Sequence, residues 1–159
     1  AAILATLYYA AATAADVAHL DVADYLPRRK NLRLDSEEGK PRRVSVQLPL
    51  GEVLDRYLAE SRKLLLAHGI VGALPVSGGG NRGSEQPPAL FVANKGHRIH
   101  VQDVRQILGE HTKAVGIKTT VNYNTLRLSR AWHLREAGES PESIQRLLGA
   151  SGRSGRRVI

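Results

Sequence analysis

The chain has 159 residues, which is enough for one ordinary domain but leaves little room for a second. Its 23 Lys and Arg residues against 15 Asp and Glu residues give a net charge of +8, and a chain this basic favours a polyanionic partner, usually nucleic acid. The absence of cysteine excludes a disulfide framework, a thiolate metal site and a cysteine nucleophile.

The N-terminal segment is rich in Ala and Leu and predicts a pair of helices. Residues 1–12 carry no charge, no Gly and no Pro, as expected of a buried helix. Thr13 can cap a second, shorter helix through about Leu20, with Asp16 in its first turn. Asp16 and Asp21 interrupt the apolar stretch before it reaches the roughly 18 residues that a membrane span needs, and it lacks the basic n-region of a signal peptide. Because the chain contains no Met and opens on this apolar run, we expect a further segment to precede it.

Two alternating segments follow and predict a β-hairpin. Asn31–Leu34 and Val44–Leu48 alternate polar and apolar residues, as half-buried strands do. The acidic segment 35–38 and the sequence Gly-Lys-Pro form the turn between them, and the tip of the hairpin is basic. Ala89–Val92 predicts a third short strand. The hairpin therefore belongs to a small antiparallel sheet.

The rest of the chain predicts helices and one long loop. Apolar residues recur at helical spacing over Gly51–His68, where Gly69 is expected to end the helix, and again over Val101–Val115. Leu126–Ala137 predicts a third such helix, and Ser140 followed by Pro141 is a favourable start for a fourth, through Leu148. Glycines and prolines make the segment from Leu74 to Pro88 a surface loop. The fold class expected from these elements is α+β, mainly helical with a small antiparallel β-sheet.

Three motifs near the C-terminus follow one another at fixed spacing. They are Asn124-Thr125-Leu126-Arg127, Leu134-Arg135-Glu136-Ala137-Gly138 and Ile144-Gln145-Arg146-Leu147-Leu148-Gly149-Ala150-Ser151. In order and spacing they resemble the His-x-Leu-Arg, Ala-Gly and Leu-Leu-Gly-His-Ser motifs of the tyrosine recombinases, also called phage integrases.

The resemblance extends through most of the chain. Leu4–Leu20 resembles the family's segment with Thr-Gly-Leu-Arg and then Glu-Leu, where Asp16 stands at the Glu. Asn31–Leu50 resembles its β-hairpin, with Gly39-Lys40 at the Gly-Lys turn and Leu48-Pro49-Leu50 at the Pro-Leu exit. The resemblance implies that residues 1–159 form one integrase-like catalytic domain and that the N-terminal DNA-clamping domain of the family is absent from this chain.

Members of that family cut DNA by attack of a tyrosine on a phosphodiester. Two arginines, a lysine and two histidines stabilise the phosphate and move protons, as growing negative charge in a transition state requires. Carried over by the motifs, Arg127 matches the second arginine and Lys40 the lysine. The first arginine, the two histidines and the tyrosine are replaced by Thr13, Asn124, Ala150 and Ile159.

These replacements favour a degenerate catalytic domain, or pseudoenzyme. Thr13 cannot hold phosphate in a bidentate fork, Asn124 cannot transfer a proton near neutral pH, and Ala150 donates nothing. We therefore expect a DNA-binding domain with impaired or lost strand cleavage. One alternative is an active recombinase whose tyrosine lies beyond Ile159. Another is a non-catalytic module, either a helix-turn-helix over Leu134–Arg157 or an assembly domain.

The basic residues are the candidate DNA contacts. Arg42 and Arg43 lie near the expected hairpin tip. The other candidates are Lys40, Asn124, Arg127, Arg153, Arg156 and Arg157. Solubilising surface charge is the alternative for the arginines, Arg127 included, and a solvated turn residue is the alternative for Lys40. Helix capping is the preferred role for Asn124.

The expected partners follow from the same interpretation. They are double-stranded DNA and a second copy of the chain on that DNA, with no membrane and no small-molecule substrate, and the expected location is the cytoplasm with the nucleoid. No cofactor is expected. No metal site is expected either, because His97 and His100 lie three residues apart in a loop without a partner ligand.

Overall fold

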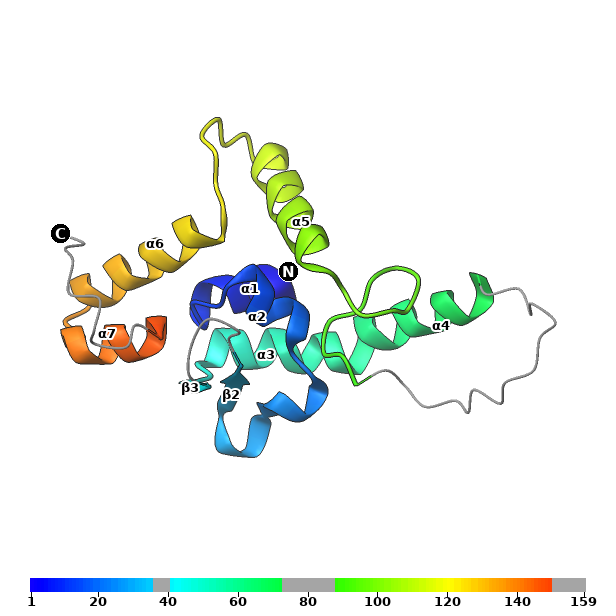
Figure 1. The fold of residues 1–159 in the computed structure, drawn as a ribbon, viewed down its shortest axis with the longest axis horizontal. Coiled ribbons are helices and arrows are strands. Elements are labelled where there is room, and N and C mark those ends of the chain that lie inside the picture. Colours follow the sequence, from blue (N-terminus) through cyan, green and yellow to red (C-terminus); the bar gives the residue numbers. More distant parts are fainter. Residues whose placement is uncertain (36–40, 73–87, 150–159) are drawn as a thin grey trace.

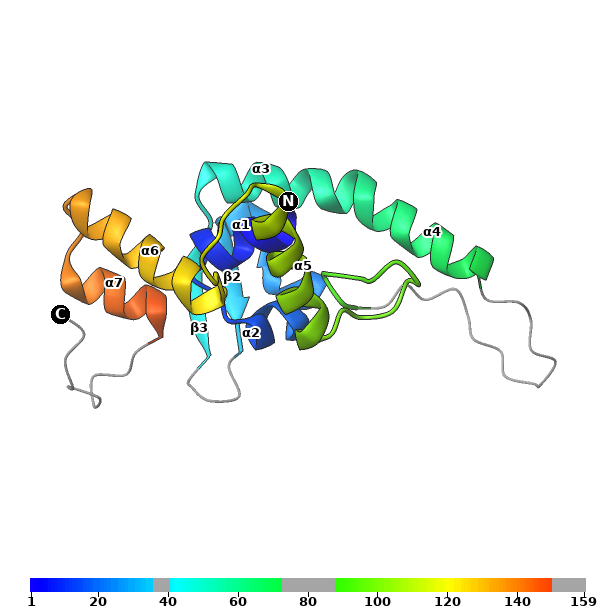
Figure 2. The same cartoon turned by 90° about the horizontal axis from the view of Figure 1, so that it is seen from above.

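The computed structural model describes residues 1–35, 41–72 and 88–149. The chain is mostly helical, with a small antiparallel sheet at one side of the helices, which confirms the predicted fold class. The arrangement is elongated: α6 (Tyr123–Glu136) and α7 (Pro141–Leu148) lie together at one end, and α4 (Arg62–Gly72) extends from the other end (Figures 1 and 2).

The two N-terminal helices lie at the centre of the fold. They are α1 (Ala2–Tyr9) and α2 (Ala14–His19), as the composition predicted. Thr13 caps α2: its side chain accepts a hydrogen bond from the Asp16 N–H, and the Asp16 carboxylate accepts one from the Thr13 N–H. This capping box satisfies two N–H groups that the helix itself leaves unpaired.

The sheet has three strands in the order β1-β2-β3, all antiparallel. They are β1 (Tyr25–Leu26), β2 (Asn31–Leu34) and β3 (Arg42–Ser45), with short 3-10 turns over Val22–Asp24 and Pro27–Arg29. The hairpin of β2 and β3 confirms the predicted pair, with Leu32 opposite Val44.

Two details of the predicted sheet were wrong. β3 begins at Arg42 and ends at Ser45, because the next helix begins at Leu48 with Pro49 in its first turn. The third strand is β1, and the segment expected as a strand, residues 89–92, forms only single bridges to Asp21 and Arg98.

A long helix packs against α1. It consists of α3 (Leu48–Arg56), the π-helical segment η3 (Tyr57–Ser61) and α4. The prediction that Gly69 ends this helix was wrong: the helix continues to Gly72, since one interior glycine costs only about 1 kcal/mol.

The π-helical segment lies against residues 89–92. The Tyr57 hydroxyl accepts a hydrogen bond from the Val92 N–H at 3.2 Å, and the Tyr57 ring packs on Phe91. Just beyond it, Arg62 is buried and donates from Nε and Nη2 to the Ala89 carbonyl at 3.1 and 3.0 Å. These contacts explain why this segment runs as a buried connection and not as a ladder strand.

The last three helices pack around this centre. α5 (Val101–Ala114) contacts α2, α6 contacts α1, and α7 contacts both α6 and β3. Ser140 caps α7 and Gly149 ends it in the left-handed conformation, as predicted. α6 begins three residues earlier than the predicted Leu126, because Asn122 supplies its cap.

The core joins these elements. Fully buried side chains come from α1, α2, β2, α3, the 89–92 segment and α5: Leu7, Val17, Leu32, Leu50, Leu54, Phe91 and Val104. Within the described ranges, no helix has the length and apolar character needed to cross a membrane.

Candidate nucleic-acid interface

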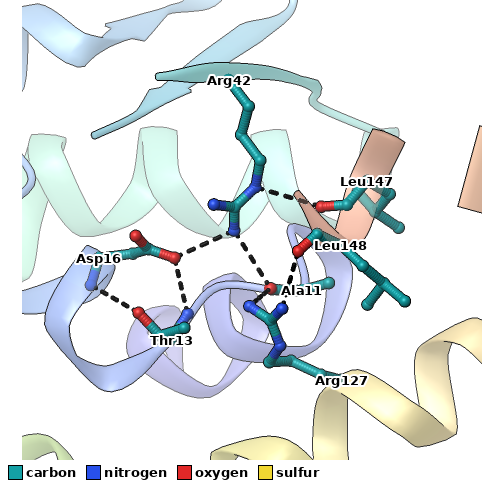
Figure 3. Close-up of polar contacts among 7 residues, drawn as sticks. All are labelled: Ala11, Thr13, Asp16, Arg42, Arg127, Leu147 and Leu148. Atoms are coloured by element: carbon teal, nitrogen blue, oxygen red, sulfur yellow. Dashed lines mark hydrogen bonds and ion pairs between the residues drawn. The ribbon is translucent and has the colours of Figure 1, made fainter. Parts of the chain in front are cut away.

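Arg127 holds three parts of the fold together. It lies on α6, and its guanidinium donates from Nη1 to the Ala11 carbonyl at 2.7 Å and from Nη2 to the Leu148 carbonyl at 2.8 Å (Figure 3). Burial lowers the pKa of Arg127, and the positive charge of Arg42 lowers it further. A guanidinium has five N–H donors, so three of them have no acceptor among the residues that the structure describes.

Arg42 lies beside it and also points inward. Its Nε donates to the Leu147 carbonyl at 3.2 Å, and its Nη2 lies 3.0 Å from an Asp16 carboxylate oxygen and 3.4 Å from the Ala11 carbonyl (Figure 3). Arg42 lies next to the hairpin turn as expected, but its side chain points into the protein and not toward solvent. The physical reason is Asp16, a buried carboxylate that requires a cationic partner.

Asp16 connects the helix cap to the arginines. Its side chain is 0% exposed, and one oxygen accepts both from the Thr13 N–H and from Arg42. Its other oxygen, Oδ1, has no hydrogen-bond partner among the described residues. Thr13, at the place of the family's first arginine, is thus engaged in the local cap, and the cation nearest to Asp16 comes from β3.

Ala11 is the residue that the sequence analysis missed. Its carbonyl accepts from both Arg42 and Arg127, and its φ of 46° lies in the left-handed region, which favours glycine. Ala11 stands two residues before Thr13, at the glycine of the Thr-Gly-Leu-Arg pattern. That correspondence was the available signal: a glycine in the pattern marks a backbone turn that aims a carbonyl at the arginines.

Asn124 does not cap its helix, so the preferred structural role for this residue was wrong. The cap of α6 is Asn122, whose side-chain oxygen accepts from the Thr125 N–H at 3.0 Å. Asn124 lies inside the first turn, with an exposed side chain. It remains close in sequence to Arg127 but contributes no charge.

The remaining candidates divide between the surface and the undescribed segments. Arg43, next to Arg42 on β3, is exposed. Lys40, Ala150, Arg153, Arg156, Arg157 and Ile159 lie outside the described residues. The structure therefore brings together Arg127 and Arg42, with Thr13 close by, and leaves the contribution of the hairpin turn and the tail as a prediction.

Nothing in the described part of the chain forms a metal centre. The rings of His97 and His100 lie 6.1 Å apart, but the described residues include no group of three histidines or carboxylates arranged to hold an ion. The arrangement around Arg127 is a pair of guanidiniums with hydrogen-bond donors that no described residue occupies.

Comparison with known proteins points to one family. The profile of the phage integrase family matches residues 1–153. The tyrosine recombinase XerC of Pelotomaculum thermopropionicum is 28% identical over 148 residues, which are 93% of this chain and 44% of that protein. The tyrosine recombinase XerD of Mycobacterium leprae is 30% identical over 148 residues, 93% of this chain and 43% of that protein.

Solved structures show the same fold. The crystal structure of XerA recombinase matches with a TM-score of 0.76 at 22% identity, over 95% of this chain and 48% of that one. The Tn1549 transposon integrase, solved in complex with a circular intermediate DNA, matches with a TM-score of 0.65 at 14% identity, over 95% of this chain and 50% of that one. The chain thus spans less than half the length of the XerC and XerD relatives that it matches.

Proposed function

Because the chain belongs to the phage integrase family, we propose that it is a double-stranded DNA-binding domain that acts in DNA recombination with impaired or lost strand cleavage. The similar XerC and XerD proteins are tyrosine recombinases, and the Tn1549 integrase was solved on DNA. The proposed work on DNA places the chain in the cytoplasm, with the nucleoid.

The observation that best supports DNA binding is that the Arg127 guanidinium is held in place and still has N–H groups to donate. Its two inward hydrogen bonds fix the guanidinium between α6, the turn at Ala11 and the end of α7, so that the side chain is held in place before any ligand arrives. Three N–H groups have no acceptor in the described part of the chain and can donate to a phosphate. The net charge of +8 adds a salt-dependent attraction to the DNA backbone.

Loss of cleavage is supported by the charge at the same place. Phosphoryl transfer needs cations positioned where negative charge grows in the transition state. Here the site has two guanidiniums, of Arg42 and Arg127, and the Asp16 carboxylate offsets one of them. Thr13 contributes only a hydroxyl, which is used in the cap, and Asn124 contributes a neutral amide. One net positive charge can hold a phosphate without stabilising its reaction strongly.

Duplex binding by Arg127 variants tests the proposal. Arg127→Ala should weaken binding to a short duplex and reduce the slope of log affinity against log salt by about 1. Arg127→Lys keeps the charge but loses the planar fork of the guanidinium, so its duplex affinity should lie between those of the wild type and Arg127→Ala. The matched control is Arg135→Ala, an exposed arginine on the same helix.

Affinities are compared only between variants whose circular dichroism spectra show the same helix content as the wild type. If a folded Arg127→Ala chain binds duplex DNA as tightly as Arg135→Ala does, Arg127 contacts no phosphate. If the wild-type chain gives no salt-sensitive binding at all, the domain does not act on DNA.

A second candidate role is assembly of two copies on DNA. Leu128 and Trp132 lie one turn apart on α6, and they are 55% and 59% exposed. Large apolar side chains on one exposed helix face favour a protein contact. Analytical ultracentrifugation with and without duplex should show a dimer that Trp132→Ser weakens. A monomer on DNA at every concentration would contradict this role.

A further inference from the structure

A polar hollow lies beside the Arg127 site, between β3 and the two C-terminal helices. Its volume is about 400 Å³, a size that suits a small ligand or one side chain of a partner. Arg43, Val44 and Ser45 line it from β3, and the side chains of Arg43 and Ser45 leave the strand on the face opposite to that of Arg42. The hollow adjoins the network of Figure 3 at Leu147, but neither Arg42 nor Arg127 lines it.

The charge of this hollow is strongly positive. Three arginines line it, Arg43 from β3, Arg130 from α6 and Arg146 from α7, against the single carboxylate of Glu139. None of the four takes part in an ion pair with any residue that the structure describes. Three guanidiniums around one small space repel one another unless an anion lies between them.

Arg130 is the unusual member of this group. It is only 9% exposed, Nη2 donates to Gln47 Oε1 at 2.6 Å, and its guanidinium lies 5.5 and 5.4 Å from the ring centres of Tyr8 and Tyr9. Its buried Nε–H has no acceptor in the described ranges. The two rings and one amide oxygen stabilise the cation in part, but a buried guanidinium normally requires a charged partner.

The geometry selects the kind of ligand. A guanidinium fork fits the oxygens of a carboxylate or a phosphate, and Arg43 and Arg146 are exposed where they can close over such a group. Because Arg130 is buried, the ligand must reach inward, which a small acid or the end of a flexible chain can do and the backbone of a stiff duplex cannot. We propose that this hollow, with Arg130 inside it and Arg43 and Arg146 at its rim, binds a single carboxylate or phosphate group.

The Nε–H resonance of Arg130 gives a direct test in the intact chain. Nitrogen-15 spectra are recorded while inorganic phosphate is added in one experiment and glutarate in another, at constant ionic strength. A saturable shift of the Arg130 signal is expected with at least one of the two, and the pair shows whether a phosphate or a carboxylate is preferred. Arg43→Gln and Arg146→Gln should each weaken the apparent affinity about threefold. Arg135→Gln, outside the hollow, should leave it unchanged.

Three results would overturn the proposal. The first is a shift that never saturates with either anion, and the second is equal affinity in wild type, Arg43→Gln and Arg146→Gln. The third is a shift of the Arg130 signal with a short DNA duplex but with neither small anion, which would assign the hollow to the DNA interface. The rim variants are exposed, so these readings do not depend on a variant that fails to fold.

Discussion

The ion pair between Arg42 and Asp16 should dominate the stability of the site. The Arg42 side chain is 11% exposed and that of Asp16 is 0% exposed, with 3.0 Å between nitrogen and oxygen. Arg42→Met keeps an unbranched apolar stem and removes the charge, which leaves a buried carboxylate without its cation and the Leu147 carbonyl without its donor. Removing one partner of a buried pair costs about 3–5 kcal/mol in the free energy of unfolding.

The adjacent arginine supplies the control. Arg43 lies on the same strand but is exposed, so Arg43→Met should change the free energy of unfolding by no more than about 0.5 kcal/mol. A double variant adds a second check. Asp16→Asn together with Arg42→Met removes the buried charge and should be more stable than Arg42→Met alone, because an asparagine oxygen can still accept from the Thr13 N–H.

Urea unfolding followed by far-ultraviolet circular dichroism measures these differences. With a slope of about 2 kcal/mol per molar urea, Arg42→Met should lower the midpoint by roughly 1.5–2.5 M. Equal midpoints for Arg42→Met and Arg43→Met would refute the reasoning, because they would mean that the pair adds nothing beyond a surface charge.

Three further predictions concern stability. Ala10 and Ala11 are both fully buried, but only Ala11 has a positive φ, so Ala11→Gly should be more stable than Ala10→Gly by about 1–2 kcal/mol in urea unfolding; equal losses would contradict this. Gly149→Ala should lower the melting temperature more than Gly138→Ala, because both glycines have positive φ and only at Gly149 would a Cβ lie 3.1 Å from the Arg42 side chain; identical melting temperatures would contradict the crowding. Burial, with a hydrogen bond to the Asp55 carboxylate, raises the pKa of Tyr25 to about 12, so the stability that the protonated hydroxyl contributes is complete below pH 10 and is lost as the pH rises toward 12. In alkaline unfolding, wild type should therefore lose stability over that range more steeply than Tyr25→Phe, and parallel curves would contradict this.

The sequence predicted what depends on local pattern. The caps at Thr13 and Ser140 and the glycine end of α7 follow from short-range hydrogen bonding, and the structure confirms them. The boundaries that failed depend on tertiary contacts. The segment around Phe91 packs on the π-helical turn at Tyr57, which no periodicity reveals.

The candidate site was predicted less completely than the fold. Arg127 was placed by its motif, and the structure puts it at the junction of three elements. The inward orientation of Arg42 was not predictable from a basic hairpin, because it depends on Asp16 being buried 26 residues away. Arg130 lacks any sequence signal, because its role depends on the two rings and the hollow beside it.

We propose that this chain binds DNA and that its strand cleavage is impaired or lost. The most direct measurement incubates the chain with nicked suicide duplexes of random sequence, then divides each sample between a native and a denaturing gel. We predict a complex on the native gel that added salt dissociates, and no covalent protein–DNA band on the denaturing gel. A covalent band would contradict the loss of cleavage, and the absence of any complex at low salt would contradict DNA binding.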